Sequence, residues 1–226
     1  MAAVRRRALV LAALALLPPA AAAAELRGRV QLVGKGGKPA QGSDLRQAVV
    51  SFRPAAAPAA APAPAPLEMV TRKKEFVPRV LAVTAGSRVR FPNQDPILHN
   101  VFSVTPEQAF DLGLYPRGAG KEQRFAEPGV VRVFCNVHHA MVGYVVVLDT
   151  PFRVHPDALG NFALSGLPAG PGRLTVWHEQ VEPWTVEVDL PHPGAIAARL
   201  EVTRPRLPAH LNKLGKPYGG RDRYRD

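Results

Sequence analysis

The chain has very little cysteine, no helical periodicity, and no long apolar run beyond its first residues. Cys135 is the one cysteine among 226 residues, so no disulfide forms within the chain. The 24 prolines and 19 glycines are too many for a helical protein. Apolar residues still make up 46% of the chain, which excludes wholesale disorder. The sequence therefore predicts an all-β protein of short strands joined by turns.

The first 24 residues have the pattern of a secretory signal peptide. Three arginines at positions 5–7 precede the apolar stretch 8–17, and an alanine run leads to Glu25. The alternative is a transmembrane anchor, but the apolar stretch is too short to span a bilayer comfortably. No later stretch is apolar enough to cross a membrane. The sequence thus predicts a mature protein without a transmembrane segment, in the periplasm or another extracytoplasmic space.

Composition divides the chain into five predicted segments. Residues 54–66 are almost entirely alanine and proline, which predicts an extended, polyproline-like spacer that does not join a sheet. Strand-like runs with turn signals lie on both sides of it, and residues 106–110 are the one candidate for a helical turn. The segments are a signal peptide (1–24), an N-terminal β segment with the spacer (25–66), a β-sandwich (67–150), a smaller β unit (151–203) and a basic tail (204–226).

The chain is basic, and much of the excess lies in the tail. The formal net charge is +11, and residues 204–226 hold seven Lys or Arg against two Asp. Such a tail suits an acidic partner, an anionic membrane surface or nucleic acid, and export argues against nucleic acid. The simpler interpretation, which we favour at this stage, is a solvated tail without fixed structure.

One loop combines the single cysteine with two other metal-binding residue types. Cys135, His138 and Met141 lie between two strand-like runs, at C-x2-H-x2-M spacing. A free thiol is a liability in an oxidising compartment, so Cys135 is either buried and inert, paired with another chain, or bound to a metal. Soft sulfur with imidazole suits copper, whereas zinc prefers more thiolates or harder ligands to a thioether. His99, at the start of an upstream strand-like run, is the candidate for the second imidazole.

These motifs resemble the cupredoxins, in particular the amicyanin and plastocyanin families. The resemblance spans residues 76–149, and the two-residue gap between His138 and Met141 is the amicyanin spacing. The other shared motifs are Phe91-Pro-Asn-Gln-Asp95, His99-Asn100-Val101 and Pro128-Gly129 leading into Cys135. The resemblance implies a Greek-key β-sandwich with one type 1 (blue) copper ion, held by His99, Cys135 and His138 in plane and by Met141 as the weak axial ligand.

The resemblance also implies features around the ligands. The backbone amide of Asn100 is expected to donate a hydrogen bond to the sulfur of Cys135. In the family, the loop histidine reaches the surface inside an apolar patch, for which Pro92, Ala140, Met141 and Val142 are the candidates here. His139 follows a ligand directly, so we expect its side chain to lie at the surface.

The smaller β unit resembles the carboxypeptidase regulatory-like, transthyretin-type β-sandwich. Asp157-Ala-Leu-Gly-Asn-Phe162 matches its D-x-x-G-x-F turn, and Leu167-Pro-Ala-Gly170 matches the L-P-x-G that follows. The family's opening, a Gly-x-Val strand and a Gly-x-Pro turn, occurs at 28–30 and 37–39. This suggests that the copper-binding sandwich is inserted into the second one, a hypothesis that requires pairing of strand 28–33 with residues 161–177. Turn chemistry explains Asp157 and Asn161 more simply than a calcium site does.

The sequence thus predicts an exported electron carrier with a redox protein as partner, and it does not indicate the oligomeric state. It shows no nucleophile with its base, no phosphate-binding loop and no second copper centre, so we expect no catalytic residues. One alternative is a periplasmic copper-handling module, a chaperone or sensor, with a partner-docking β-sandwich. Another is a structural β-sandwich protein that has lost its metal.

Overall fold

The computed structural model describes residues 23–40, 44–56, 60–206 and 210–218. The predicted signal peptide, apart from its last two residues, lies outside these ranges. The described part of the chain is all-β, as predicted. Its helices are two 3-10 turns, η1 (Lys35–Gly37) and η2 (Leu45–Gln47), and none of the described helices has the length and hydropathy to span a bilayer.

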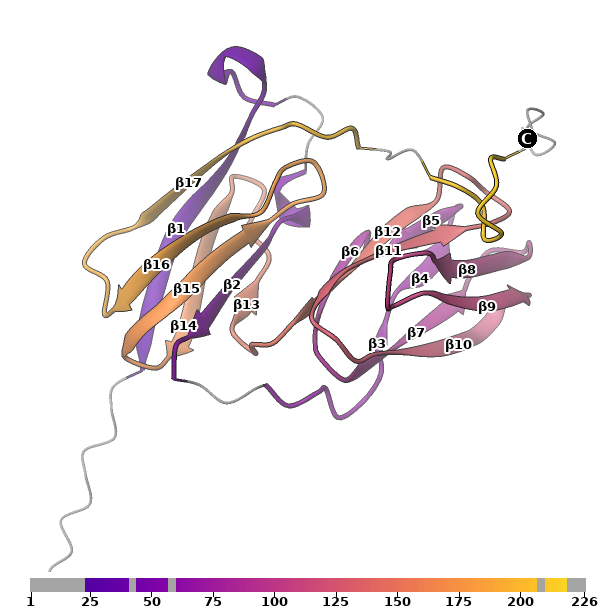
Figure 1. Cartoon of the computed structure of the whole chain (residues 1–226), viewed down its shortest axis with the longest axis horizontal. Coiled ribbons are helices and arrows are strands. Elements are labelled where there is room, and N and C mark those ends of the chain that lie inside the picture. The colour runs from indigo at the N-terminus through magenta and orange to yellow at the C-terminus, as the bar shows by residue number, and fades with distance from the viewer. Residues whose placement is uncertain (1–22, 41–43, 57–59, 207–209, 219–226) are drawn as a thin grey trace, which may run out of the picture.

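The middle of the chain forms a sandwich of two sheets (Figure 1). Buried apolar side chains from both sheets form one cluster between them, as expected where strands alternate inward and outward side chains. One sheet has the order β10 (Gly118–Phe125), β7 (Ser87–Asn93), β4 (Val70–Arg72) and β5 (Glu75–Val77), with β3 (Leu67–Glu68) also paired to β7. The other has the order β6 (Val80–Thr84), β12 (Val142–Leu148), β11 (Gly129–Cys135), β8 (His99–Ser103) and β9 (Phe110–Tyr115).

Strands from both ends of the chain form a second pair of sheets around a separate apolar cluster. The three-stranded sheet has the order β14 (Asn161–Leu167), β1 (Ala24–Val33) and β17 (Ile196–Glu201). The four-stranded sheet has the order β13 (Arg153–Val154), β2 (Val49–Pro54), β15 (Gly170–Trp177) and β16 (Trp184–Leu190). We call this the outer sandwich, and the one built from residues 67–148 the inner sandwich.

The inner sandwich lies in the sequence between two strands of the outer one. Strand β2 precedes it and β13, the strand that pairs with β2, follows it. Strand β1 pairs with β14 in an antiparallel register that includes Leu26 opposite Leu164 and Arg29 opposite Asn161. This pairing is the contact on which the insertion hypothesis depends.

The two sandwiches share a third apolar cluster at their junction. Val49 and Trp177 of the outer sandwich pack there with residues of the inner one, and the rings of Trp177 and Tyr144 are 5.4 Å apart. A bidentate ion pair crosses the same junction. Arg79 donates from Nε and Nη2 to the two carboxylate oxygens of Glu179, at 2.8 and 2.6 Å. The two sandwiches are therefore joined by a packed apolar interface and by a buried ion pair between Arg79 and Glu179.

Two local expectations differ from the structure, and a third is confirmed. Pro54, placed in the spacer by composition, is the last residue of β2 and lies opposite Gly172 of β15. Strand β13 pairs with β2 at Val50 and Ser51, so Pro54 lies beyond the end of that pairing, where a missing N–H is tolerated. Residues 106–110 form no helix: Gln108 donates to the carbonyl of Thr105 in a single turn, and β9 begins at Phe110. Asp157 accepts hydrogen bonds from the amides of residues 159 and 161, which confirms its turn role.

Candidate metal centre

Two neighbouring strands and one loop bring the predicted ligands together. His99 is the first residue of β8 and Cys135 is the last residue of β11. These strands pair antiparallel, with Cys135 opposite Val101, so the cysteine lies two residues along the ladder from His99. His138 comes from the loop between β11 and β12, which turns back on itself through a 3.0 Å hydrogen bond from the Met141 amide to the His138 carbonyl.

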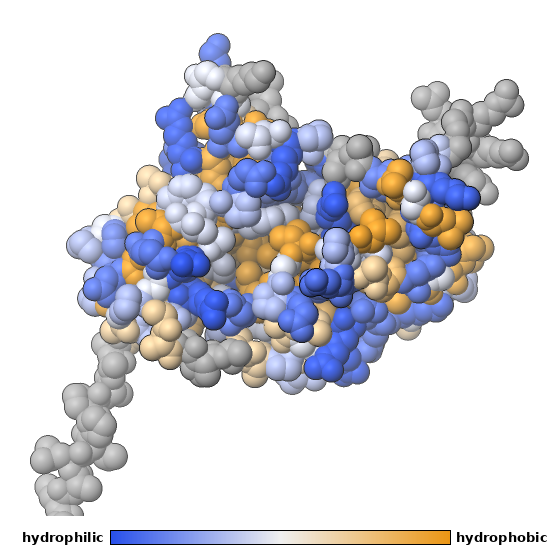
Figure 2. Space-filling model, viewed as in Figure 1, coloured by the Kyte–Doolittle hydropathy of each residue, from blue (hydrophilic) through white to orange (hydrophobic). Residues whose placement is uncertain are grey.

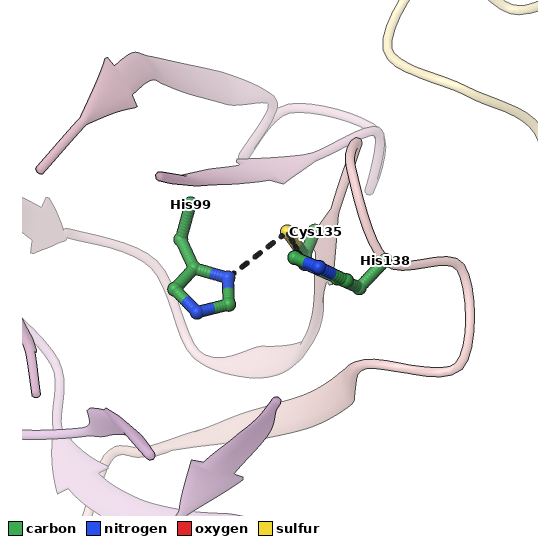
Figure 3. A group of neighbouring side chains, drawn as sticks. All are labelled: His99, Cys135 and His138. Carbon is green, nitrogen blue, oxygen red and sulfur yellow. Dashed lines mark hydrogen bonds between the residues drawn. The ribbon is translucent and has the colours of Figure 1, made fainter. Parts of the chain in front are cut away.

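The three donor atoms of His99, Cys135 and His138 form a compact triangle (Figure 3). The sulfur of Cys135 lies 3.6 Å from Nδ1 of His99 and 3.8 Å from Nδ1 of His138. All three donor atoms lie within 4.8 Å of one another. Had His99 been distant from the thiol, the predicted site would not exist.

These distances would suit a single transition-metal ion shared by the three donors. Nitrogen and sulfur ligands lie about 2.0–2.3 Å from such an ion, and three of them at trigonal angles are then about 3.5–4 Å apart. The two measured sulfur–nitrogen distances fall in that interval. The sulfur thus lies at a distance from each imidazole that suits binding to one shared metal ion, and this donor set is the one that suits copper.

Burial and backbone amides prepare the thiol for binding as thiolate. Cys135 and His99 are both fully buried. Burial alone would raise the pKa of the Cys135 thiol, but hydrogen bonds from His99 and from the amides of Asn100, Val137 and His138 outweigh it, and the pKa is lowered. The Asn100 amide thus contacts the sulfur as the family resemblance implied. A lowered pKa favours the deprotonated sulfur that a metal binds.

A buried carboxylate, Asp95, holds His99 from behind. Its Oδ2 lies 2.8 Å from Nε2 of His99, and its two oxygens accept the backbone amides of Lys73 and Lys74 at 2.6 and 2.9 Å. Burial alone would lower the pKa of His99, but Cys135 and Asp95 together raise it. The contact fixes the ring so that Nδ1 faces the sulfur. The sequence analysis named Asp95 only as part of a shared motif. Its position four residues before His99 is the sequence feature that could have indicated this contact.

We expect Asp95→Asn to weaken copper binding by about 10- to 100-fold, because an amide orients the imidazole less firmly and leaves it less basic. Competition against a chelator of known affinity measures the effect. Asp189→Asn, at an exposed position on β16 of the outer sandwich, is the matched control and should leave the affinity unchanged. Equal affinities for the two variants would show that Asp95 does not support the ligand.

Met141 is buried in the same apolar cluster as Cys135, at 1% exposure. Its role as axial ligand stays a prediction. The apolar surface patch expected around His138 is wrong in two of its four members, because Met141 and Val142 are both buried. Ala140 is exposed, and Pro92 is half-buried. The exposed apolar side chains nearest to His99 along the chain are instead Ile97 and Leu98, at 37% and 50% exposure.

Strand β11 is covered on both faces next to the ligands. Cys135 faces the core of the inner sandwich, whereas Phe134 belongs to the cluster shared with the outer sandwich. Adjacent strand residues point to opposite faces, so one side of the strand supports the metal centre and the other contacts the second sandwich. The outer sandwich therefore packs against the strand that carries the thiol and supports it.

The tail expected to be without fixed structure is ordered over residues 210–218, which we call the C-terminal strap. Residues 212–216 form a closed turn, in which the amide of Asn212 donates to the carbonyl of Lys216 at 2.9 Å. The ring of Tyr218 lies 3.6 Å from that of His139, so His139 is half-buried and not open at the surface. The tail prediction is thus wrong for this segment, because aromatic contacts hold it against the ligand loop.

No family model matches the chain, and no curated protein sequence matches it. Some solved structures are similar to part of the chain. A reduced variant of amicyanin is 23% identical to it, with a TM-score of 0.36, and the match covers 45% of this chain and 99% of amicyanin. A reduced Cu(I) form of another amicyanin variant at pH 4 is 25% identical over the same shares, also with a TM-score of 0.36. A copper-containing nitrite reductase from Thermus scotoductus SA-01 is 26% identical, with a TM-score of 0.35, and the match covers 43% of this chain and 26% of the enzyme.

Proposed function

We propose that the protein is an exported type 1 copper protein that carries single electrons between redox partners. The observation that carries this proposal is the triangle of His99, Cys135 and His138, with sulfur–nitrogen distances of 3.6 and 3.8 Å. A thiolate with two imidazoles, completed by a thioether, is the ligand set of blue-copper electron-transfer sites. Met141, buried in the same apolar cluster as Cys135, would supply the thioether.

The arrangement of the protein's own groups suits electron transfer. A copper ion bound here supplies a one-electron couple between Cu(I) and Cu(II). The ligands come from two paired strands and a short loop, so their positions are fixed by the sheet and by the turn at His138. A donor set held in place in this way reorganises little when charge changes, and the burial of His99 and Cys135 keeps water from the thiolate.

We assign the protein no catalytic activity. The four proposed ligands fill the coordination positions, so a substrate has no open one to occupy. Burial of His99 and Cys135 also speaks against a copper-handling role, because a site that delivers its metal must let it leave readily. We place the protein outside the cytoplasm, with a redox protein as its partner.

The proposal is tested on the chain that begins at Glu25, loaded with Cu(II). We expect one copper per chain, an intense blue absorption, loss of that absorption with ascorbate and its return with ferricyanide. The copper should resist a chelator that strips an accessible site within minutes. A colourless complex whose copper passes quickly to the chelator would refute electron transfer and favour copper handling.

A further inference from the structure

The C-terminal strap is anchored directly on the loop that carries the predicted ligands. The ring of His210 stacks on that of Phe134, with centroids 4.2 Å apart and planes 11° apart. The backbone amide of Lys213 donates to the side-chain oxygen of Asn136 at 3.2 Å, and its Nζ pairs with Asp111 at 2.8 Å. With Tyr218 on His139, the strap thus contacts the chain on both sides of Cys135 and His138.

The strap turns its apolar side chains outward while its rings face the protein. Leu211 and Leu214 are 45% and 73% exposed. Seven large apolar residues are exposed in the described part of the chain, and five of them lie on elements at this end. They are Leu211 and Leu214 on the strap, Ile97 and Leu98 just before His99, and Leu114 on β9 opposite Asn100. Grouped exposed apolar residues mark interaction sites, unlike single ones.

Exposed basic residues border these apolar side chains. Lys73 and Lys74 occupy the turn between β4 and β5, Arg117 follows β9, and Lys216 lies on the strap; all four are exposed. Figure 2 shows apolar and hydrophilic residues side by side at the end of the molecule next to the C-terminal segment.

Most of the acidic side chains at this end of the inner sandwich form hydrogen bonds or ion pairs within the protein. Asp95 lies against His99, and Asp111 pairs with Lys213 and accepts from Asn100. Glu75, the first residue of β5 and next to Lys74, is exposed. The end of the inner sandwich that holds the metal centre is therefore apolar with a basic border.

We propose that the strap and the exposed apolar residues beside it form the surface on which an acidic redox protein docks. The inference rests on the proposed electron-transfer function and names the partner's chemistry: a protein with an apolar contact area bordered by Asp and Glu. Opposite charges steer such a partner to the end where His138 lies, and the leucines contribute apolar burial once it arrives.

A protein partner fits the strap better than a membrane surface does. The strap is an irregular turn with two exposed leucines, not an amphipathic helix with a long apolar face. Even one myristoyl chain, which is far more apolar than two leucines, binds membranes only marginally.

The test measures binding by calorimetry at low ionic strength, with the copper-loaded chain from Glu25 and the acidic haem domain of cytochrome b5 as the probe. We expect Lys216→Glu and Leu214→Ser each to weaken binding by about threefold or more. Lys216 and Leu214 are chosen because their side chains are exposed and, among the described residues, take no part in the anchoring contacts of His210, Lys213 and Tyr218. The controls are Lys38→Glu and Leu159→Ser, at exposed positions of the outer sandwich, and they should leave binding unchanged.

Basic cytochrome c should bind more weakly than cytochrome b5 and should gain affinity from Lys216→Glu. Equal effects of the strap and control variants, no binding of cytochrome b5, or binding only to phosphatidylserine vesicles would each overturn the docking proposal. Because heat is measured and not colour, the result is read whether or not the copper-loaded chain is blue. A colourless chain refutes the proposed function separately.

Discussion

Replacing Cys135 with serine abolishes the blue absorption of the copper-loaded protein and leaves the fold intact: this is the expected result with the largest spectroscopic effect. The thiolate is the soft, strong ligand of the set, and a serine hydroxyl does not ionise near neutral pH to replace it. Serine is only slightly smaller than cysteine, so its side chain should still fill the fully buried position of Cys135. The visible spectrum at equal protein and copper concentrations measures the loss, and circular dichroism checks the fold.

A second sulfur-bearing residue in the same core provides the control. Met69 is fully buried in the cluster that contains Cys135 and Met141, but it is not a predicted ligand. Met69→Leu should keep the blue absorption, and Met141→Leu should alter it without abolishing it. Persistent blue colour in Cys135→Ser would place the copper elsewhere on the chain.

Replacing Arg79 with alanine should lower the free energy of unfolding by about 3 kcal/mol or more. Glu179 is buried at the junction of the two sandwiches, with its side chain 1% exposed, and its carboxylate would lose its guanidinium partner. Arg79 also donates to the carbonyls of Val142 and Arg206, at 3.0 and 2.8 Å. The substitution thus leaves the buried carboxylate of Glu179 without its charged partner, which is the costly way to break a buried ion pair.

Urea denaturation of the copper-free chain measures this effect without a contribution from the metal. The matched control is Arg173→Ala, which removes the ion pair of Arg173 with Glu187 at 62% and 69% side-chain exposure. Exposed pairs contribute at most about 1 kcal/mol, so the control should be nearly neutral. Similar losses for Arg79→Ala and Arg173→Ala would show that the junction does not depend on the buried pair.

The three residues of the ligand triangle could be predicted from the sequence because their residue types and spacing are typical of metal sites, whatever the details of the fold. A single cysteine has few explanations in a chain with a predicted signal peptide, and the spacing to His138 limits them further. His99 was a candidate from its place at the start of an upstream strand-like run, and the family resemblance then linked it to a loop far along the sequence. The strands with β-branched runs, such as β11 and β12, were also evident from alternation and apolar content.

The edge strands, the strap and the role of Asp95 were hard to predict from the sequence, for physical reasons. Strands β9 and β10 lie at the edges of their sheets, and their glycines and charged residues give no strand-like pattern. The strap is held by two ring contacts and a few hydrogen bonds between residues far apart in sequence, which no local pattern encodes. Asp95 was overlooked because a single acid in a loop is common, and only its contact with His99 sets it apart.

The position of the inner sandwich between β2 and β13 has a consequence for the order in which the chain folds. Among the described strands, β1 pairs with β14 and β17, so it lacks both partners until residues 161–201 have been synthesised. The pairings of β8 with β9 and of β11 with β12 are much closer in sequence and form sooner. The inner sandwich is therefore expected to be complete while the first strand still lacks neighbours on both edges. That interval is when the newly made chain is most exposed to proteases and aggregation.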